Sequence, residues 1–404
     1  MMRVAVIGSG VSGLGAAYLL ARRHDVCVFE RAARPGGHAN TVLHRGLALD
    51  TGFLVHNTRT YPFLVRLLRE LGVGTHESEM SFSVSCSRCG LEYAGRSPFA
   101  QRANAIAPGF LALLWEIGRW LRTARAAVER LGDEDRSLAE FLDEQGYSDR
   151  FRRHFIVPLT SALWSAAPSR ALELPAASAI RFFDNHGMLG FRRLRWRTIT
   201  GGSRAYVQAI ASRLGPALRL ELGVRSLRRT PDGVEVRCDD DTVRRFDHVV
   251  VATHADEALA LLEDPSADER RLLGAFEYTT NEAVLHTDAA LLPRAPRARA
   301  SWNYRVARDG PPTVTYHLNR LQALAAEVDY LVTLNAPVRE DRLIARFTYR
   351  HPLFGFETLR AQRELPALGG RRRTWFAGAY FGNGFHEDGL ASGVRAAAAL
   401  GAPW

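Results

Sequence analysis

Residues 3–30 have the sequence RVAVI-GSGVSG-LGAAYLLARRH-DVCVFE, and this stretch decides the fold. The apolar run at 3–7 is typical of a buried parallel strand. It leads into G-x-G-x-x-G at 8–13, then into a helix of small and apolar residues, and a second strand at 25–29 ends at Glu30. We therefore predict a strand–turn–helix–strand unit that binds a dinucleotide.

Each residue of this unit has a separate expected role. Gly8 permits the tight turn, Gly10 lets backbone N–H groups approach a pyrophosphate, and Gly13 lets helix and strand pack closely. Ser12 lies at the N-terminus of the helix, where the positive end of the dipole favours phosphate. Glu30 follows Gly10 by 20 residues, where a ribose-binding carboxylate is expected. Because an acid there disfavours a 2′-phosphate, the pattern indicates FAD or NAD rather than NADP.

Length and composition indicate a soluble protein of two or three domains. The chain has 404 residues, of which 47% are hydrophobic and 24% charged, as in ordinary globular proteins. No apolar run reaches the roughly 18 residues of a membrane-spanning helix. The chain opens on a strand rather than on a signal peptide. We therefore expect a cytoplasmic protein.

The basic residues are all arginine: the 53 counted basic residues include no lysine, and the net charge is +10. The absence of lysine excludes Schiff-base chemistry, pyridoxal phosphate and a P-loop. The arginine bias has two explanations that remain open together, a GC-rich genome and an arginine-rich face for phosphates or anionic lipid. We expect no nucleic-acid partner, because the arginines are dispersed and no recognition motif accompanies them.

Cysteine gives a weak signal. Cys86 and Cys89 form a single CxxC, whereas a structural zinc site needs further ligands and neither Cys27 nor Cys238 has a nearby mate. We interpret the CxxC as a hairpin turn and predict no metal, with a redox or metal role as the alternative.

A second glycine pair follows Glu30. Arg34, Gly36 and Gly37 match the Arg-x-Gly-Gly-Arg extension of the dinucleotide fingerprint, with His38 in place of the final arginine. Here the chain resembles the flavin-containing amine-oxidoreductase superfamily, which includes the carotenoid desaturases. The resemblance implies FAD as the cofactor and leaves the role of His38, which is able to face the flavin, open.

Later segments fit the same superfamily, at 201–206, 246–253, 373–380 and 384–393. The resemblance implies an adenine contact at Val224 and ribityl contacts at Gly378 and Asp388. It also implies that the N–H groups of Gly389 and Leu390, at the start of the last helix, point at the N1/O2 edge of the flavin. The remaining contacts that it implies come from Arg31 and, beside the flavin ring, from Gly52 and Phe53.

The fold class that follows is α/β in a mixed α+β chain. A Rossmann-type FAD-binding domain, built from 1–57, 200–260 and 365–404, is interleaved with a substrate domain of mixed sheet and helices, built from 58–199 and 261–364. Within the latter, 103–199 is expected to be mostly helical. Its apolar segment, 110–121, is followed by arginines and is predicted to lie on an anionic membrane surface, the alternative being a buried packing helix.

Several phrases narrow the resemblance, at 50–57, 60–62, 182–187, 252–256 and 379–382. They are similar to a bacterial family of FAD/NAD-binding proteins encoded beside cyclopropane-fatty-acid-synthase-like methyltransferases. That resemblance implies desaturation of a methylated unsaturated acyl chain of a phospholipid, on the pathway to furan fatty acids. Hydride transfer to flavin N5 and loss of a neighbouring proton would give a conjugated methylated diene. The methyltransferase is an expected partner, at the inner membrane.

Three histidines are candidates for the base that takes the proton: His186, His317 and His386. Asn185 and Tyr316, which precede the first two, are further catalytic candidates. Amine-oxidase relatives hold a lysine that assists reaction with oxygen. Because this chain lacks lysine, we expect slow oxidation by oxygen and a quinone or another electron acceptor. The alternatives are an amine oxidase, a carotenoid-type desaturase or isomerase, and a non-catalytic FAD-binding partner of a lipid methyltransferase.

Overall fold

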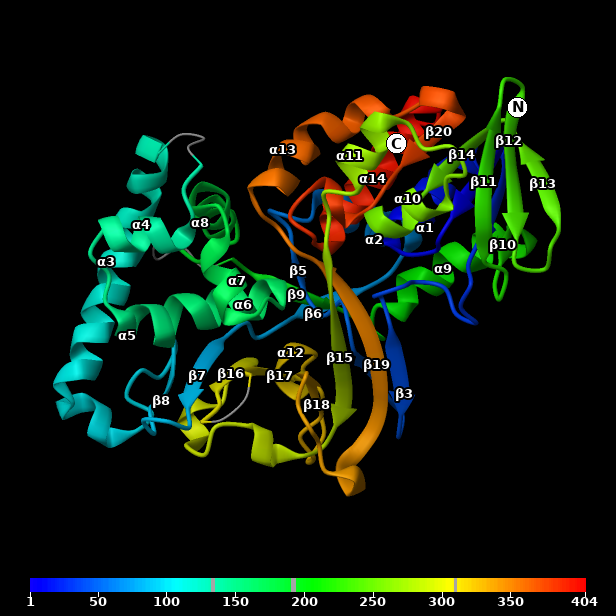
Figure 1. Cartoon of the computed structure of the whole chain (residues 1–404). Helices are drawn as coiled ribbons and strands as arrows, with labels where there is room; N and C mark the ends of the chain where they lie inside the picture. The colour runs from blue at the N-terminus through cyan, green and yellow to red at the C-terminus, as the bar shows by residue number, and fades with distance from the viewer. Residues whose placement is uncertain (132–134, 190–193, 309–310) are drawn as a thin grey trace.

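The computed structural model describes residues 1–131, 135–189, 194–308 and 311–404. One region of the molecule is built on a parallel sheet in the strand order β10-β2-β1-β14-β20. Its strands β10, β14 and β20 are labelled at the upper right of Figure 1. The strands come from distant parts of the sequence: β1 Arg3–Ile7, β2 Asp25–Phe29, β10 Leu218–Arg219, β14 His248–Val251 and β20 Thr374–Phe376. The predicted α/β class with a Rossmann-type sheet is confirmed.

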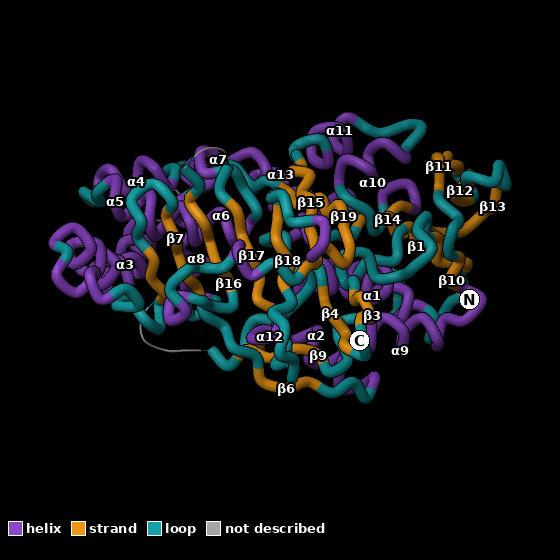
Figure 2. Tube along the Cα trace, turned by 90° about the horizontal axis from the view of Figure 1, so that it is seen from below, coloured by secondary structure: helices purple, strands orange, loops and turns teal. Residues whose placement is uncertain are grey.

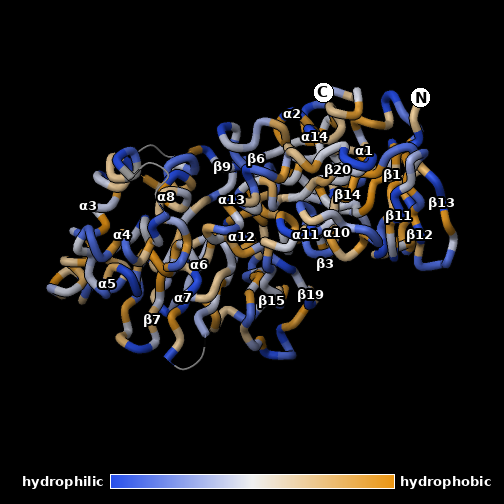
Figure 3. The backbone as a smooth tube through the Cα atoms, turned by 45° about the horizontal axis from the view of Figure 1, so that its top comes forward, coloured by the Kyte–Doolittle hydropathy of each residue, from blue (hydrophilic) through white to orange (hydrophobic). Residues whose placement is uncertain are grey.

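Both faces of this sheet are buried, because successive side chains of a strand point to opposite sides. Val4 and Val6 of β1 join one hydrophobic core, and Ala5 and Ile7 join another. Figure 3 shows β1 in hydrophobic colours. The first core is covered by helices α1 Val11–Leu20, α2 Pro62–Leu71, α9 Arg204–Leu214 and α14 His386–Ala399.

The second core lies under an antiparallel three-stranded sheet and three helices. These elements are β11 Val224–Thr230, β12 Gly233–Cys238, β13 Val243–Phe246, α10 Ala255–Leu261, α11 Ala267–Leu273 and α13 Phe356–Glu364.

A seven-stranded mixed sheet forms the second region, in the order β19-β15-β18-β17-β16-β7-β8. β7 and β16 pair in parallel, and the other neighbours are antiparallel. Its strands are β7 Phe82–Cys86, β8 Glu92–Ala94, β15 Tyr278–His286, β16 Trp302–Val306, β17 Thr313–His317, β18 Leu331–Leu334 and β19 Leu343–Pro352, with the short helix α12 Leu318–Leu321 after β17.

Two small sheets lie between the regions. They are formed by β3 Thr41–His44 and β4 Leu47–Asp50, and by β5 His56–Asn57, β9 Trp196–Ile199 and β6 Thr75–Glu77. The carboxylate of Asp50 accepts hydrogen bonds from Thr41, Ser203 and Gln322, and so ties the second region to the start of α9. Burial raises the pKa of Asp50 to about 6.

Most of the described residues between 102 and 185 are helical, and these helices lie at the far end of the molecule from β11–β13 (Figure 2). Their segments are η1 Arg102–Ile106, α3 Pro108–Leu131, α4 Leu138–Glu144, α5 Asp149–Phe151, the π-helical η2 Arg152–Ile156, α6 Val157–Trp164, α7 Pro168–Glu173 and α8 Ala176–Asn185. The buried Trp120 of α3 shares a core with Val84 and Tyr93 of the β7–β8 hairpin. The helices therefore pack directly on the edge of the seven-stranded sheet. Among the described residues, no helix is long and apolar enough to cross a membrane.

Candidate functional site

The turn between β1 and α1 has the geometry that its glycines predict. Gly8 has φ +94°, and a Cβ at Gly13 would lie 1.9 Å from the carbonyl oxygen of Gly8. A Cβ at Gly10 would meet nothing within 4 Å. The backbone at Gly10 therefore borders free space, as a cradle for a pyrophosphate requires.

Glu30 lies directly beside this turn. Its carboxylate accepts hydrogen bonds from the N–H and hydroxyl of Ser9, at 2.9 and 2.6 Å, and from the N–H of Ala32 at 2.9 Å. Val224 begins the adjacent β11. The exposed Arg31 forms an ion pair with Glu257 at 2.9 Å, so its side chain is directed toward α10.

The second glycine pair folds onto the first motif. Gly36 donates its N–H to the carbonyl of Ser9 at 2.9 Å, and a Cβ at Gly37 would lie 3.2 Å from the Cα of Gly10. Arg34 donates to the carbonyl of Gly37 at 3.0 Å. The two predicted phosphate-binding segments thus form one surface.

The last helix, α14, begins beside α1. A Cβ at Gly389 would lie 2.9 Å from the Ser12 hydroxyl, and one at Gly15 would lie 2.4 Å from the Leu390 side chain. Gly378 donates its N–H to Ser392 of α14 at 2.8 Å. The close helix packing brings two positive N-terminal helix ends to one region.

The expected donors of α14 need correction. The N–H of Gly389 donates to the carbonyl of Phe385 within the helix, and the side chain of Leu390 is fully buried in the core. Because only the first turn of a helix leaves N–H groups unpaired, the free donors are those of His386, Glu387 and Asp388. The Asp388 carboxylate itself accepts from the N–H groups of Asn383 and Phe385; burial raises its pKa to about 6.

His38 lies in a cluster of rings that the sequence did not predict. Its ring centroid is 4.8 Å from that of Tyr349, 5.4 Å from His351 and 5.9 Å from His254. Burial is the main cause of the low pKa of these histidines, well below the usual value for His38 and about 4 for His351. The cluster is therefore uncharged at neutral pH. No local pattern signals it, because β19 reaches this place from about 300 residues further along the chain.

Gly52, Phe53 and His386 also meet here. Phe53 donates its N–H to the carbonyl of His38 at 3.0 Å, and its ring stacks on His386 with centroids 3.9 Å apart. A Cβ at Gly52 would lie 2.1 Å from the His38 carbonyl oxygen. Burial lowers the pKa of His386 to about 3, and its Nε2 lies 2.8 Å from the Tyr206 hydroxyl. If Tyr206 donates this hydrogen bond, the lone pair of His386 is occupied.

These residues fit a bound FAD. The glycine surface offers free backbone beside Glu30 and two helix N-termini. His38, His351 and His386 lie deep inside the fold, yet each retains a partly accessible surface. Groups of this kind border an internal space rather than a closed core, as a site for the flavin ring requires.

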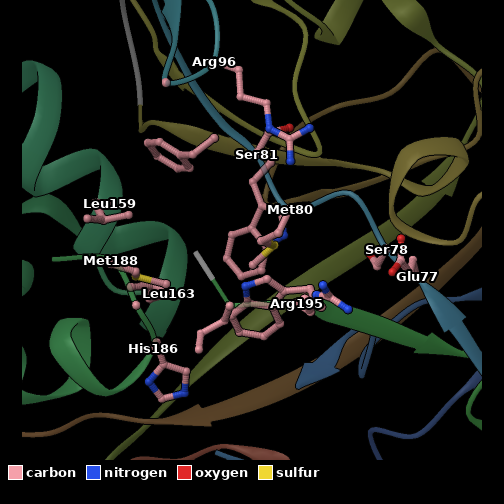
Figure 4. Close-up of a pocket in the computed structure, with 16 residues that line it drawn as sticks. Glu77, Ser78, Met80, Ser81, Arg96, Leu159, Leu163, His186, Met188 and Arg195 are labelled. Atoms are coloured by element: carbon pink, nitrogen blue, oxygen red, sulfur yellow. The ribbon is translucent and has the colours of Figure 1, made fainter. Parts of the chain in front are cut away.

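A separate apolar cavity of about 650 Å³ lies between the helices and the seven-stranded sheet. Apolar side chains from the loop before β7, from α6, from the residues after α8 and before β9, and from β9 and β16 line it. They are Met80, Leu159, Leu163, Met188, Leu194, Trp196 and Trp302. Figure 4 shows His186 at one end of this cavity and Arg96 at the other.

His186 connects this cavity with α14. Its Nδ1 lies 3.0 Å from the carbonyl of Phe182, so Nδ1 carries the proton and Nε2 is the acceptor in the neutral ring. Its ring centroid is 5.9 Å from that of Phe385, the residue before His386. Burial lowers the pKa of His186, and Arg59 contributes to the same effect. His186 is thus a neutral acceptor between the cavity and the flavin-edge helix.

The other catalytic candidates are not brought to the cavity surface. Asn185 is exposed at the end of α8. His317 lies 3.0 Å from Asp329 through its Nε2. Tyr316 is buried with its ring edge-on to Trp302, at 4.9 Å between centroids, so it supports the cavity wall from behind. Their catalytic roles stay predictions, and the geometry favours His186.

The parallel sheet and the glycine surface beside Glu30 are those of an FAD-binding α/β protein. The model of the flavin containing amine oxidoreductase family matches residues 11–295. The chain therefore belongs to this flavin-containing family.

Known proteins similar to the chain have different substrates in their names. A Mycobacterium tuberculosis protein named as a flavin-containing monoamine oxidase, AofH, is 27% identical over 278 residues, which are 65% of this chain and 59% of that protein. The chain thus matches less than two thirds of the length of that relative. A putrescine oxidase bound to putrescine has 15% identity and a TM-score of 0.73, covering 99% of this chain and 98% of its own. A CLA-producing fatty acid isomerase from P. acnes has 17% identity and a TM-score of 0.66, covering 97% of both chains. At such identities the two structures share the fold alone.

Proposed function

We propose that the protein desaturates a methylated unsaturated fatty acyl chain of a phospholipid to a conjugated methylated diene. The observation that carries this proposal is the apolar cavity, whose His186 end adjoins the start of α14. Its volume is within the usual range for a small-molecule site. Its leucine, methionine and tryptophan walls suit a hydrocarbon chain better than a small cation.

The other end of the cavity suits an anionic head group. Arg96 lies there, 3.7 Å from Glu79 and half exposed, and Arg195 also lines the cavity and forms no ion pair with the described residues. Guanidinium groups bind phosphate through paired hydrogen bonds. A phospholipid would thus enter with its acyl chain directed toward His186.

The protein's own residues position the substrate, exclude water and supply a base. A bound flavin supplies the two-electron acceptor for the hydride that leaves the substrate. The aromatic and aliphatic walls hold the allylic carbon in a region that excludes water. The neutral Nε2 of His186 takes the proton from the neighbouring carbon, which completes the double bond.

The test is anaerobic reduction of the bound flavin by a phospholipid that carries a methyl-branched monoenoic chain. We expect the visible flavin band to bleach and a conjugated diene to appear in the extracted lipid. Leu163→Trp fills the cavity and should slow this reduction by roughly tenfold or more while FAD stays bound. The matched control is Leu43→Trp on the exposed face of β3, where the side chain is 62% exposed. Full flavin reduction in Leu163→Trp would contradict the assignment of this cavity.

The amine oxidase remains the second candidate, because of the family match and the relative AofH. Aromatic faces and acids bind an ammonium substrate. The cavity has two tryptophans, Trp196 and Trp302, and one acid, Glu77. Arg96 and Arg195 also line it, however, and would repel a cation. Rapid reduction of the flavin by putrescine or another polyamine, with none by lipid, would establish this candidate instead. Failure of both substrates would favour a carotenoid-type reaction or a non-catalytic partner of a methyltransferase.

We also propose that an exposed apolar strip docks the protein on the inner membrane. The strip consists of Phe99, Ile106, Leu111 and Trp115, which are 43%, 84%, 43% and 62% exposed. It begins three residues after Arg96 of the cavity. Two arginines of α3 already have partners within the protein: Arg119 donates to the carbonyls of residues 145 and 146, and Arg125 pairs with Asp184.

Removal of apolar area from this strip should weaken membrane binding. We expect the double variant Ile106→Ser, Trp115→Ser to bind phosphatidylglycerol vesicles at least about tenfold more weakly in a sedimentation assay, since two buried side chains contribute more than 1.4 kcal/mol. Val243→Ser, at a 50% exposed position on β13, should bind like the unchanged protein. Equal binding by all three proteins would contradict docking through the strip.

The proposed reaction requires an enzyme that supplies the substrate and a molecule that accepts the electrons. A methyltransferase must supply the methylated acyl chain, which is the reason to expect a cyclopropane-synthase-like enzyme beside this one. The chain has no lysine, so we propose slow reaction of the reduced protein with oxygen and a membrane quinone as the electron acceptor. A fast, oxygen-dependent burst of peroxide on addition of lipid would contradict this.

A further inference from the structure

Two cysteines and one histidine meet at a place remote in sequence from the flavin segments. Cys86 ends β7, Cys89 lies in the following turn, and His154 lies in η2. Gly90, with φ +73°, donates its N–H to the carbonyl of Cys86 at 2.8 Å and closes the turn. The expected hairpin therefore exists, and it turns both thiols toward the third residue.

The spacing of the three side chains suits a metal ion. One ligand atom of each residue lies within 4.8 Å of the others, and Cys89 Sγ is 3.9 Å from His154 Nε2. On a tetrahedral zinc ion two thiolates lie about 3.8 Å apart, and a thiolate lies about 3.5 Å from an imidazole nitrogen. Small side-chain movements would bring all three to the metal.

The imidazole of His154 has no other satisfactory partner. It is 4% exposed, and within the described part of the chain its Nδ1 has no hydrogen-bond partner. Among the described residues its Nε2 has one polar contact, with Cys89, and a thiol is a weak hydrogen-bonding group. A buried polar ring normally has a stronger partner, which a metal at Nε2 would provide.

The backbone of His154 is also held in place by a hydrogen bond from the β7–β8 hairpin. Tyr93 of β8 donates its hydroxyl to the carbonyl of His154 at 2.6 Å, so the hairpin and η2 are already joined. Cys86 is buried and Cys89 is exposed. An ion would therefore reach the cluster from solvent on the Cys89 side.

We propose that Cys86, Cys89 and His154 bind one Zn²⁺ ion, with water in the fourth position on the exposed side. Two thiolates balance the charge of the ion, and both thiol protons are released on binding. The ion joins the sheet edge to η2, which continues directly into α6. Because Leu159 and Leu163 of α6 line the apolar cavity, zinc would fix one wall of that cavity.

The test begins with the full-length, FAD-loaded protein, equilibrated with Zn²⁺ and passed through gel filtration before metal analysis. We expect one zinc per chain. Cys89→Ser and His154→Gln should each weaken zinc binding by more than about 100-fold, while Cys27→Ser, which alters a thiol in β2, should retain it. Unchanged zinc binding in both ligand variants would overturn the proposal, as would the absence of bound zinc in the unchanged protein kept reduced.

A second measurement needs no variant. Zn²⁺ should slow alkylation of Cys86 and Cys89 in the unchanged protein, as mapped by mass spectrometry, with Cys27 as the internal reference. Zn²⁺ bound elsewhere would leave the two alkylation rates unchanged and would overturn the assignment. Neither measurement depends on the substrate. Both would therefore test zinc binding even if the desaturase proposal proved wrong.

Discussion

Gly13→Ala should leave the protein unable to hold FAD. The added Cβ would lie 1.9 Å from the carbonyl oxygen of Gly8, so α1 would have to move away from β1. We expect FAD affinity to fall by more than about 100-fold and the free energy of unfolding of the apoprotein to fall by roughly 3 kcal/mol. Flavin titration of the apoprotein and denaturant unfolding measure the two effects.

Gly10→Ala should weaken FAD binding while leaving the stability of the apoprotein almost unchanged. A Cβ at Gly10 meets nothing within 4 Å, and its φ of −63° is accessible to any residue. The apoprotein should therefore unfold within about 0.5 kcal/mol of the unchanged protein. FAD affinity should nevertheless fall about tenfold or more, because the methyl group occupies the approach of the pyrophosphate. Undiminished FAD binding by Gly10→Ala would contradict the placement of the phosphates.

His186→Gln should slow reduction of the flavin by the lipid substrate by about 10²- to 10⁴-fold, the usual contribution of a general base. The glutamine has a similar length but cannot accept a proton. FAD binding should persist, because His186 lies beyond the glycine surface that holds the cofactor. Anaerobic stopped-flow reduction measures the rate.

The pKa of His186 determines how the rate of flavin reduction should change with pH. Burial lowers the pKa of His186 below 6.5, so the neutral form is present at pH 7–8 and is lost only as the pH falls through the lowered pKa. The rate should be constant at neutral pH and decline in acid, and His186→Gln should remove that acid limb. His317→Gln is the matched control, since its pKa is also lowered by burial but it does not line the cavity. Equal losses in both variants would contradict the assignment of the base.

The cofactor motif could be predicted because its physics is local. Gly8, Gly10 and Gly13 act through backbone conformation and contact within one turn, and Glu30 directly follows the next strand. The resemblance at Arg34 and Gly37 extended the motif by only a few residues. The error at Gly389 also has a local cause: the position of α14 was expected correctly, but its first residue determines which N–H groups stay unpaired.

The sequence was sufficient to predict the strand–turn–helix–strand unit, since this unit depends on short spacings within residues 3–30. The family and the flavin followed from a resemblance spread over several segments. Tertiary packing decided which histidine borders the cavity. It also decided that His38 meets His351, and that His154 completes a group with Cys86 and Cys89. These contacts join residues 65 to 313 positions apart, and the packing of separate sheets and helices, rather than any local periodicity, determines them.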